Sequence, residues 1–152
     1  MRTPTIASLT AGDRLPDWVV GKLTRTTLAL YAGGSGDHVP LHIDIDFARK
    51  VARMDDVIGH GMLTMAYLGR YLVRQAPQSH LRKFSTRFVG MSKPGDVIHC
   101  EGKVVAARTE GSVRIIEVEI AAKRDNDEVL ATGSAQWSFE GEELIVNMRR
   151  DW

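Results

Sequence analysis

The chain has 152 residues, of which 43% are apolar and 26% are charged. A chain of this length and composition can bury about two thirds of its unfolded surface in one globular domain, which argues against an intrinsically disordered protein. Its 20 basic and 19 acidic residues are interleaved and give a net charge of +1, which excludes the electrostatic footprint of a protein that binds nucleic acid or an anionic membrane. We expect a single domain over residues 1–152.

The cysteine content and the hydropathy predict the compartment. A single cysteine, Cys100, can form no disulfide within the chain and cannot build a cysteine-based zinc site, which fits a reducing compartment. Residues 1–18 lack the apolar core of a signal peptide. The longest apolar run, residues 62–73, is shorter than the roughly 17 residues that a membrane span needs, and an arginine interrupts it. We therefore expect a cytoplasmic protein with neither nucleic acid nor a membrane among its partners.

The first half of the chain predicts three helices after a short strand over residues 18–20. Thr24 can cap a helix that runs to residue 32, because its hydroxyl can accept a hydrogen bond from a first-turn N–H. The glycine-rich residues 33–36 are expected to end that helix. Asp44 can cap a short second helix in the same way. The apolar run predicts the longest helix, over about residues 61–75, because a proline follows it.

After the longest helix, the apolar residues change to the period-two alternation of β-strands. Four strands are predicted there, over residues 83–89, 98–106, 112–123 and 129–139. Turns are expected at residues 93–96 and 125–127, and a phase slip at residues 115–116 predicts a β-bulge. The C-terminal segment 142–152 is expected to extend the last strand or to pack on a partner. Consecutive strands after one apolar helix predict an α+β fold, with a curved antiparallel β-sheet wrapped around the long helix.

Asp37 and His42 lie five positions apart in the loop after the glycine-rich turn. A carboxylate and an imidazole that meet can take a proton from water and deliver one to carbon. Pro40 excludes a helix between them, so they meet only if the loop folds back on itself. The other interpretation is an aspartate that caps a turn and a histidine bonded to the backbone, which on spacing alone is the commoner arrangement.

Gly61 lies at the start of the longest helix. The first N–H groups of a helix have no partner inside it and carry the positive end of its dipole. A glycine there lets a carbonyl oxygen come close, which is the geometry of an oxyanion hole. The alternative is that Gly61 only turns the chain or permits close packing.

A metal site is the least favoured interpretation of the same stretch. His38, His42 and His60, together with Asp37, offer donor atoms that metals bind. Pro40 leaves no helical i, i+4 pair of histidines, and no cysteine lies nearby. Histidines that are hydrogen-bonded in a loop are the ordinary case, so we expect no metal.

The loop and the long helix carry short motifs that are specific only in combination. The residues concerned are Tyr31-Ala32, Ser35-Gly36-Asp37, Pro40-Leu41-His42 and, eighteen residues after His42, His60-Gly61-Met62, with Arg87-Phe88-Val89 and Pro94-Gly95-Asp96 further on. Together they resemble the signature of the MaoC-like, or (R)-specific enoyl-thioester hydratase, family. That signature has an apolar or aromatic residue, then Ser/Thr-Gly-Asp-x-Asn-Pro, an apolar residue and His, and later His-Gly-Met at the start of the long helix. The resemblance covers essentially the whole chain.

The resemblance implies a single hotdog fold, in which a curved antiparallel sheet wraps around the helix over about residues 61–75. It also implies a homodimer, or a heterodimer with a second hotdog chain. The implied substrate is a trans-2-enoyl thioester of coenzyme A or of an acyl-carrier protein. Water would add to it reversibly and give the (R)-3-hydroxyacyl thioester. No cofactor is implied apart from this thioester.

The catalytic residues of the family correspond to Asp37, His42 and Gly61 in this chain. Asp37 and His42 would hold and activate the water, one accepting its proton while the other helps to protonate C2. The N–H of Gly61 would receive the thioester oxygen as negative charge develops on it. The neighbouring residues expected to bind the substrate are Ser35, His60 and Met62.

One residue departs from the family's pattern, because Val39 stands where the family has Asn before the proline. A side chain able to brace the loop by hydrogen bonding is therefore missing, and Ser35 or His38 could take over that function. The departure leaves open a second kind of protein, a non-catalytic acyl-binding subunit that pairs with another hotdog chain. The three residues in catalytic positions count against it.

A hotdog thioesterase, which would hydrolyse the thioester, is a further alternative. Thioesterases of this fold commonly carry a carboxylate on the central helix. In this chain Tyr67, Gly69 and Arg70 occupy the interior of that helix. The sequence therefore favours hydration over hydrolysis.

Overall fold

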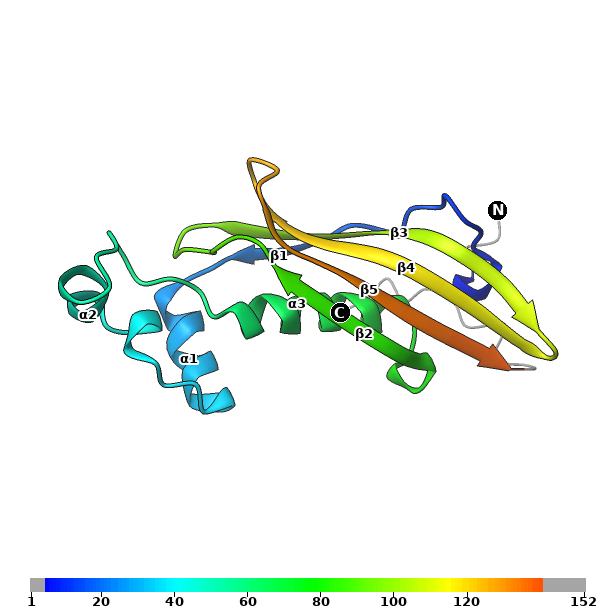
Figure 1. Cartoon of the computed structure of the whole chain (residues 1–152), viewed down its shortest axis with the longest axis horizontal. Helices are drawn as coiled ribbons and strands as arrows, with labels where there is room; N and C mark the ends of the chain where they lie inside the picture. Colours follow the sequence, from blue (N-terminus) through cyan, green and yellow to red (C-terminus); the bar gives the residue numbers. More distant parts are fainter. Residues whose placement is uncertain (1–4, 141–152) are drawn as a thin grey trace.

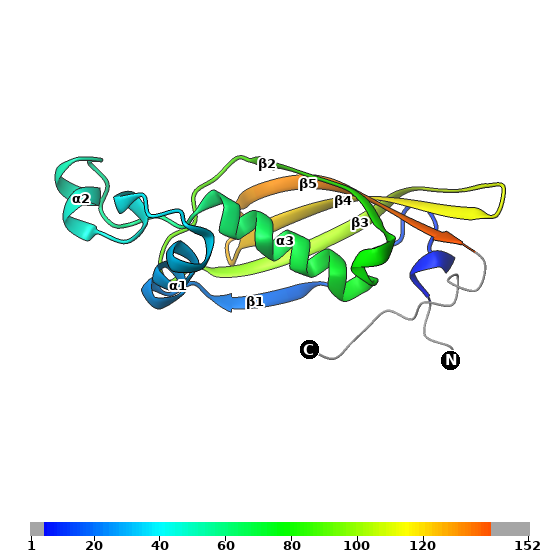
Figure 2. The ribbon, with the colours of Figure 1, turned by 90° about the horizontal axis from the view of Figure 1, so that it is seen from below.

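An antiparallel sheet and one long helix make up most of the structure, a computed structural model that describes residues 5–140. The sheet has five strands in the order β1-β3-β4-β5-β2. Its strands are β1 (Trp18–Lys22), β2 (Leu81–Phe88), β3 (Val97–Glu110), β4 (Val113–Arg124) and β5 (Val129–Glu140). The long helix, α3 (Gly61–Gln75), lies against one face of the sheet (Figures 1 and 2). The predicted α+β fold, with a sheet wrapped around a central helix, is confirmed.

The smaller helices lie at the two ends of this layer (Figures 1 and 2). They are α1 (Arg25–Ser35), α2 (Ile45–Lys50) and the short 3₁₀ turns η1 (Ile6–Ser8), η2 (Pro40–His42) and η3 (Gln78–His80), with α1, η2 and α2 together at one end. Figure 1 shows α1 and α2 beyond the end of the sheet, on the side where α3 begins. This arrangement brings the loop between α1 and α2 to the N-terminus of α3. Within residues 5–140, no helix is both long and apolar enough to cross a membrane.

The capping residues act as predicted, but α1 is longer than predicted. The Thr24 hydroxyl accepts a hydrogen bond from the Thr27 N–H at 3.0 Å, and the Asp44 carboxylate caps α2 through two backbone N–H groups. The expected end of α1 at residue 32 is wrong, because Gly33 and Gly34 continue the helix. Among the glycines of residues 33–36, only Gly36 adopts a left-handed conformation, with φ 76°, which a glycine accommodates without strain.

One face of α3 forms the centre of the apolar core. The buried apolar residues of this face are Leu63, Leu68, Tyr71 and Leu72. Tyr71 and Leu72 pack in the same cluster as Trp137 of β5, and all three are completely buried. Full burial of one such side chain contributes about 1.5–3 kcal/mol. The opposite face of α3 exposes Met62, Ala66 and Arg70.

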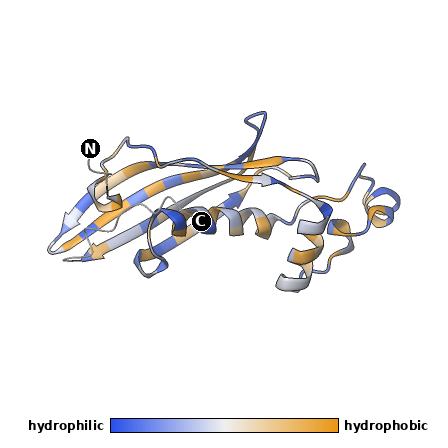
Figure 3. Cartoon of the chain, turned by 180° about the vertical axis from the view of Figure 1, so that it is seen from behind, coloured by the Kyte–Doolittle hydropathy of each residue, from blue (hydrophilic) through white to orange (hydrophobic). Residues whose placement is uncertain are grey.

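The strands follow the predicted alternation of apolar and polar residues, which is visible along the sheet in Figure 3. On β4 the buried residues Ile116, Val118, Ile120 and Ala122 share the face that packs on α3. The predicted bulge at residues 115–116 is wrong, because both residues pair in regular register with β5. The irregularity lies on the neighbouring strand β3, between Val104 and Ala106. Two adjacent isoleucines place one apolar side chain on each face of a regular strand, which imitates a phase slip.

The two predicted turns are also present. Gly95 in the first has φ 102° and Asp127 in the second has φ 61°. The segment 142–152 lies outside the described residues. The expectation of one domain over residues 1–152 stays a prediction.

Candidate active site

The loop between α1 and α2 folds back so that three polar side chains meet. One carboxylate oxygen of Asp37 and one ring nitrogen each of His42 and His60 lie within 4.8 Å of one another. His60 directly precedes α3, so the cluster lies at the N-terminus of that helix. The spacing of Asp37 and His42 in the sequence did not show whether they meet. In the structure they lie close together.

Hydrogen bonds between residues close in the sequence hold the loop in this folded-back conformation. The Ser35 hydroxyl donates to the Tyr31 carbonyl at 2.7 Å and accepts from the Asp37 N–H at 3.2 Å. The Asp37 carboxylate accepts from the Val39 N–H at 3.4 Å. Ser35 therefore braces the loop, which is the function suggested for it because Val39 replaces the family's Asn. The expectation that Ser35 binds the substrate stays a prediction. The Val39 side chain is 49% exposed, and only its backbone takes part.

His42 is oriented by the backbone of the segment before α3. Its Nδ1 lies 2.9 Å from the Ile58 carbonyl oxygen. A carbonyl oxygen can only accept, so Nδ1 carries the proton of the neutral ring. The other nitrogen, Nε2, is then the basic one. A half-buried imidazole with a fixed tautomer is suited to proton transfer.

His60 lies between His42 and α1. Its ring stacks on the His42 ring, with centroids 3.9 Å apart and planes inclined by 26°, and the Tyr31 ring meets it edge-on at 4.9 Å. Its Nε2 lies 3.2 Å from the Asp37 carbonyl oxygen. Burial, followed by the nearby His42, lowers the pKa of His60, and the contacts with Asp37 oppose this effect. Burial and the Asp37 charge raise the pKa of Tyr31.

The first N–H groups of α3 lie beside this cluster. The His60 carbonyl accepts from the N–H groups of Leu63 and Thr64. The N–H groups of Gly61 and Met62 precede these bonds and belong to the unpaired first turn that every helix has. Met62, expected to bind the substrate, is 52% exposed at this end of the helix.

The cluster does not have the geometry of a metal site. A metal ion lies in the plane of each imidazole that binds it, about 2.0–2.1 Å from the nitrogen. The stacked rings of His42 and His60 have nearly parallel planes, so one ion cannot meet this condition for both. His38 is exposed and lies outside the cluster.

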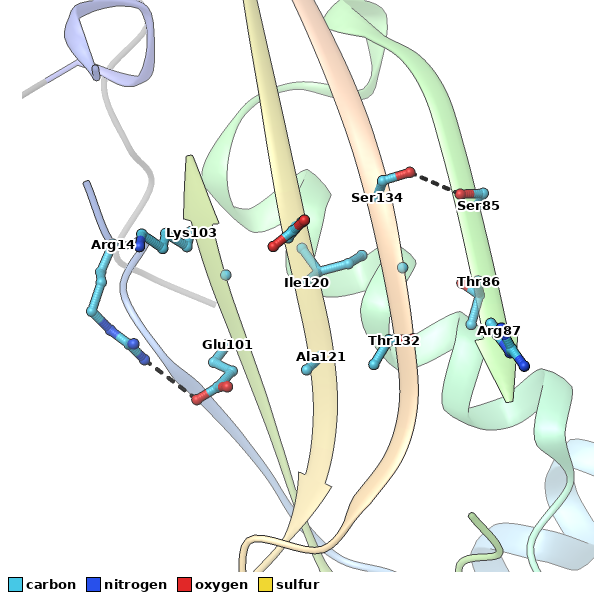
Figure 4. Close-up of a pocket in the computed structure, with 13 residues that line it drawn as sticks. Arg14, Ser85, Thr86, Arg87, Glu101, Lys103, Ile120, Ala121, Thr132 and Ser134 are labelled. Atoms are coloured by element: carbon cyan, nitrogen blue, oxygen red, sulfur yellow. Dashed lines mark hydrogen bonds and ion pairs between the residues drawn. The ribbon is translucent and has the colours of Figure 1, made fainter. Parts of the chain in front are cut away.

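Two hollows differ in their relation to the cluster. A cavity of about 290 Å³ reaches His42, and its lining consists of Arg25, Thr26, Ala29, His42, Ile43 and Val57. A larger hollow of about 690 Å³ lies on the face of the sheet opposite α3, where Ser85 bonds to Ser134 and Arg14 pairs with Glu101 (Figure 4). None of the predicted site residues lines the larger hollow, whereas His42 lines the smaller cavity, which therefore reaches the site.

Two aromatic residues near the cluster were not predicted as site residues. In the sequence, Tyr31 appeared only in the motif Tyr31-Ala32, which does not indicate a contact with His60. The Phe88 ring lies 3.6 Å from the position that a Cβ atom at residue 61 would occupy. Phe88 reaches this place through the pairing of β2 with β5, which no local pattern reveals.

Comparisons with known proteins identify relatives of this chain. The 3-hydroxyacyl-thioester dehydratase Y of Mycobacterium tuberculosis is 32% identical over 112 residues, which cover 72% of this chain and 37% of the relative. The chain spans between 6% and 37% of the length of the curated relatives that it matches.

Solved structures share the fold. An (R)-hydratase from A. caviae involved in PHA biosynthesis is 26% identical, with a TM-score of 0.73 over 85% of this chain and 96% of that one. A ChsH1-ChsH2 complex from Mycobacterium tuberculosis is 19% identical, with a TM-score of 0.71 over 84% of this chain and 96% of that one. The expected hotdog fold is thus confirmed. The family described as MaoC like domain matches residues 13–127. This chain therefore belongs to the MaoC-like family of hydratases and dehydratases.

Proposed function

We propose that the chain catalyses the reversible addition of water to a trans-2-enoyl thioester, which gives the (R)-3-hydroxyacyl thioester. The thioester would be carried by coenzyme A or by an acyl-carrier protein, and the protein would work as a homodimer or with a second hotdog chain. The observation that carries the proposal is the meeting of Asp37 and His42 at the N-terminus of α3.

Asp37 and His42 supply the groups that hydration needs. A water held between the Asp37 carboxylate and Nε2 of His42 loses one proton to this pair as its oxygen bonds to C3. The electrons of the C2–C3 double bond move towards C1 and leave an enolate on the thioester oxygen. A proton returned from the pair to C2 completes the addition of one water molecule. General acid–base assistance of this kind typically contributes about 10²–10⁴-fold.

Gly61 would stabilise the enolate through its N–H. The position does not require glycine for its own packing, because an added Cβ would lie 3.6 Å from the Phe88 ring, an ordinary contact, and φ is not in the left-handed region. Gly59 is different, because a Cβ there would collide with the Ser92 hydroxyl. The glycine at residue 61 is therefore best explained by a group that approaches from outside. An oxyanion-hole donor is worth about 2.7–4 kcal/mol.

The alternatives have weaker support. A thioesterase of this fold commonly carries a carboxylate on the central helix, and the 15 residues of α3 include neither Asp nor Glu. A non-catalytic acyl-binding subunit was suggested by Val39. The loop nevertheless folds back, because Ser35 and the Asp37 carboxylate brace its backbone.

Hydration of crotonyl-coenzyme A and of a longer enoyl-coenzyme A tests the proposal, followed as loss of enoyl absorbance, with chiral analysis of the product. We expect Asp37→Asn and His42→Ala to lower kcat by about 10²–10⁴-fold while circular dichroism stays unchanged. His99→Ala is the matched control, because His99 pairs with the Asp125 carboxylate at 2.7 Å outside the site. Folded Asp37 and His42 variants that keep wild-type activity would contradict the proposal.

A further inference from the structure

His60 occupies a position that the reaction as proposed does not use. It has an exposed fraction of only 1%, so it offers a substrate almost no surface. It nevertheless contacts both residues that would activate water, the backbone of Asp37 through Nε2 and the ring of His42 through its face. The substrate-binding role expected for His60 stays a prediction, and its observed contacts are of another kind.

The hydrogen bonds of His60 select one tautomer. Nε2 faces the Asp37 carbonyl, which can only accept, so Nε2 carries the proton. Nδ1 is buried and has no hydrogen-bond partner within residues 5–140. A second proton would therefore place an N–H where no acceptor receives it, close to His42 and to the positive end of α3. The titratable groups that face the ring are Tyr31 from α1, Asp37 from the loop and His42 from η2. Asp37 favours the charged ring, but burial and the nearby His42 outweigh it and lower the pKa of His60.

We propose that His60 is a positioning residue, whose uncharged ring joins the Asp37 backbone to the His42 ring and so sets the separation of the two groups that activate water. This inference rests on the proposed hydratase function. The His42 ring is then held by the Ile58 carbonyl at one edge and by the His60 ring on one face. A misplacement of about 1 Å in such a pair can lower the rate about 10²-fold, so a buried neighbour that fixes it has a large effect without touching substrate.

Three substitutions separate the two contacts of His60. His60→Phe keeps a flat ring against His42 but cannot donate to the Asp37 carbonyl. His60→Gln keeps an amide donor but has no ring, and His60→Ala has neither. His80→Phe is the matched control, because His80 is also buried, bonds to the Ser138 carbonyl at 3.2 Å and lies 4.7 Å from the Phe139 ring, beyond the other end of α3.

The variants are compared by kcat and KM with enoyl-coenzyme A substrates and by NMR titration of the His42 ring. We expect His60→Ala to lower kcat about tenfold to hundredfold with little change in KM, and to shift the titration midpoint of His42. His60→Phe or His60→Gln should recover part of the lost kcat, and His80→Phe should resemble the wild type in both measurements.

The titration keeps this inference separate from the proposed function. A wild-type protein without hydratase activity would refute the proposed function, and the His42 titration would still report whether His60 controls His42. A folded His60→Ala variant with wild-type kcat and an unchanged His42 titration would overturn the inference.

Discussion

The buried apolar residues form two clusters, one between the sheet and α3 and one beneath the candidate site. The first runs the length of the sheet and includes the completely buried Trp137, Tyr71 and Phe139. The second is small, and its buried members are Leu23, Leu28, Ala48, Val57 and Leu63. The large cluster holds the fold, whereas the small one supports a loop that is otherwise shaped by a few hydrogen bonds.

This comparison indicates that stability and the proposed activity depend on separate parts of the chain. A residue of the sheet cluster contributes through apolar area removed from water, which is nearly independent of direction. The site residues would contribute to the proposed activity through the placement of a few polar atoms, because proton transfer needs hydrogen-bond distance. Substitutions in the sheet cluster should therefore lower stability, whereas substitutions in the site should lower activity.

The largest expected effect is on stability, at the centre of the sheet cluster. Trp137→Ala removes a completely buried side chain and leaves a cavity, which should lower the free energy of unfolding by about 3–5 kcal/mol. Urea unfolding followed by circular dichroism measures this loss. If the variant unfolds at the wild-type urea concentration, the sheet cluster is not the main source of stability.

A smaller effect is expected at Gly61, at the start of α3, where a substitution should lower activity without lowering stability. Gly61→Ala adds a methyl group that the Phe88 ring tolerates, so the variant should keep its unfolding midpoint yet lose at least about tenfold in kcat/KM as the approach to the N–H narrows. Gly59→Ala is the paired variant, and it should be destabilised because the methyl group meets the Ser92 hydroxyl. Equal activity of Gly61→Ala and wild type would remove Gly61 from the mechanism.

The smallest effect is a pH dependence of stability. Burial, as the main cause, puts the pKa of His60 below its ordinary value of 6.5. Below about pH 6.5 the unfolded chain binds a proton there that the native ring does not, so the contribution of His60 is complete above this pH and is lost as the pH falls. His60→Phe removes this titration and should show a flatter decline of unfolding free energy between about pH 7 and pH 5. An unchanged slope in the variant would show that His60 titrates normally.

The sheet and the long helix could be predicted because their signals are local. Alternation marks the strands, and apolar length together with Pro77 marks α3. The wrong prediction of a bulge at residues 115–116 shows that such local signals do not determine strand register. Two adjacent isoleucines do not reveal that the irregularity lies on β3, because register is a property of two strands.

The site could be predicted only as a set of residues. The resemblance named Asp37, His42 and Gly61, but the spacing across Pro40 was compatible with residues that never meet. Their meeting depends on the left-handed Gly36 and on hydrogen bonds of the His42 and His60 rings to backbone carbonyls distant in the sequence, which form only in the folded chain. The contacts of Tyr31 and Phe88 likewise depend on long-range packing.

The most direct test of the central claim is a double-mutant cycle of Asp37→Asn and His42→Ala, measured as kcat/KM for crotonyl-coenzyme A. If the two residues act on one water as a unit, the double variant should lose no more activity than the more damaged single variant. Losses that multiply in the double variant would show that the two residues act independently and would contradict the account of the site.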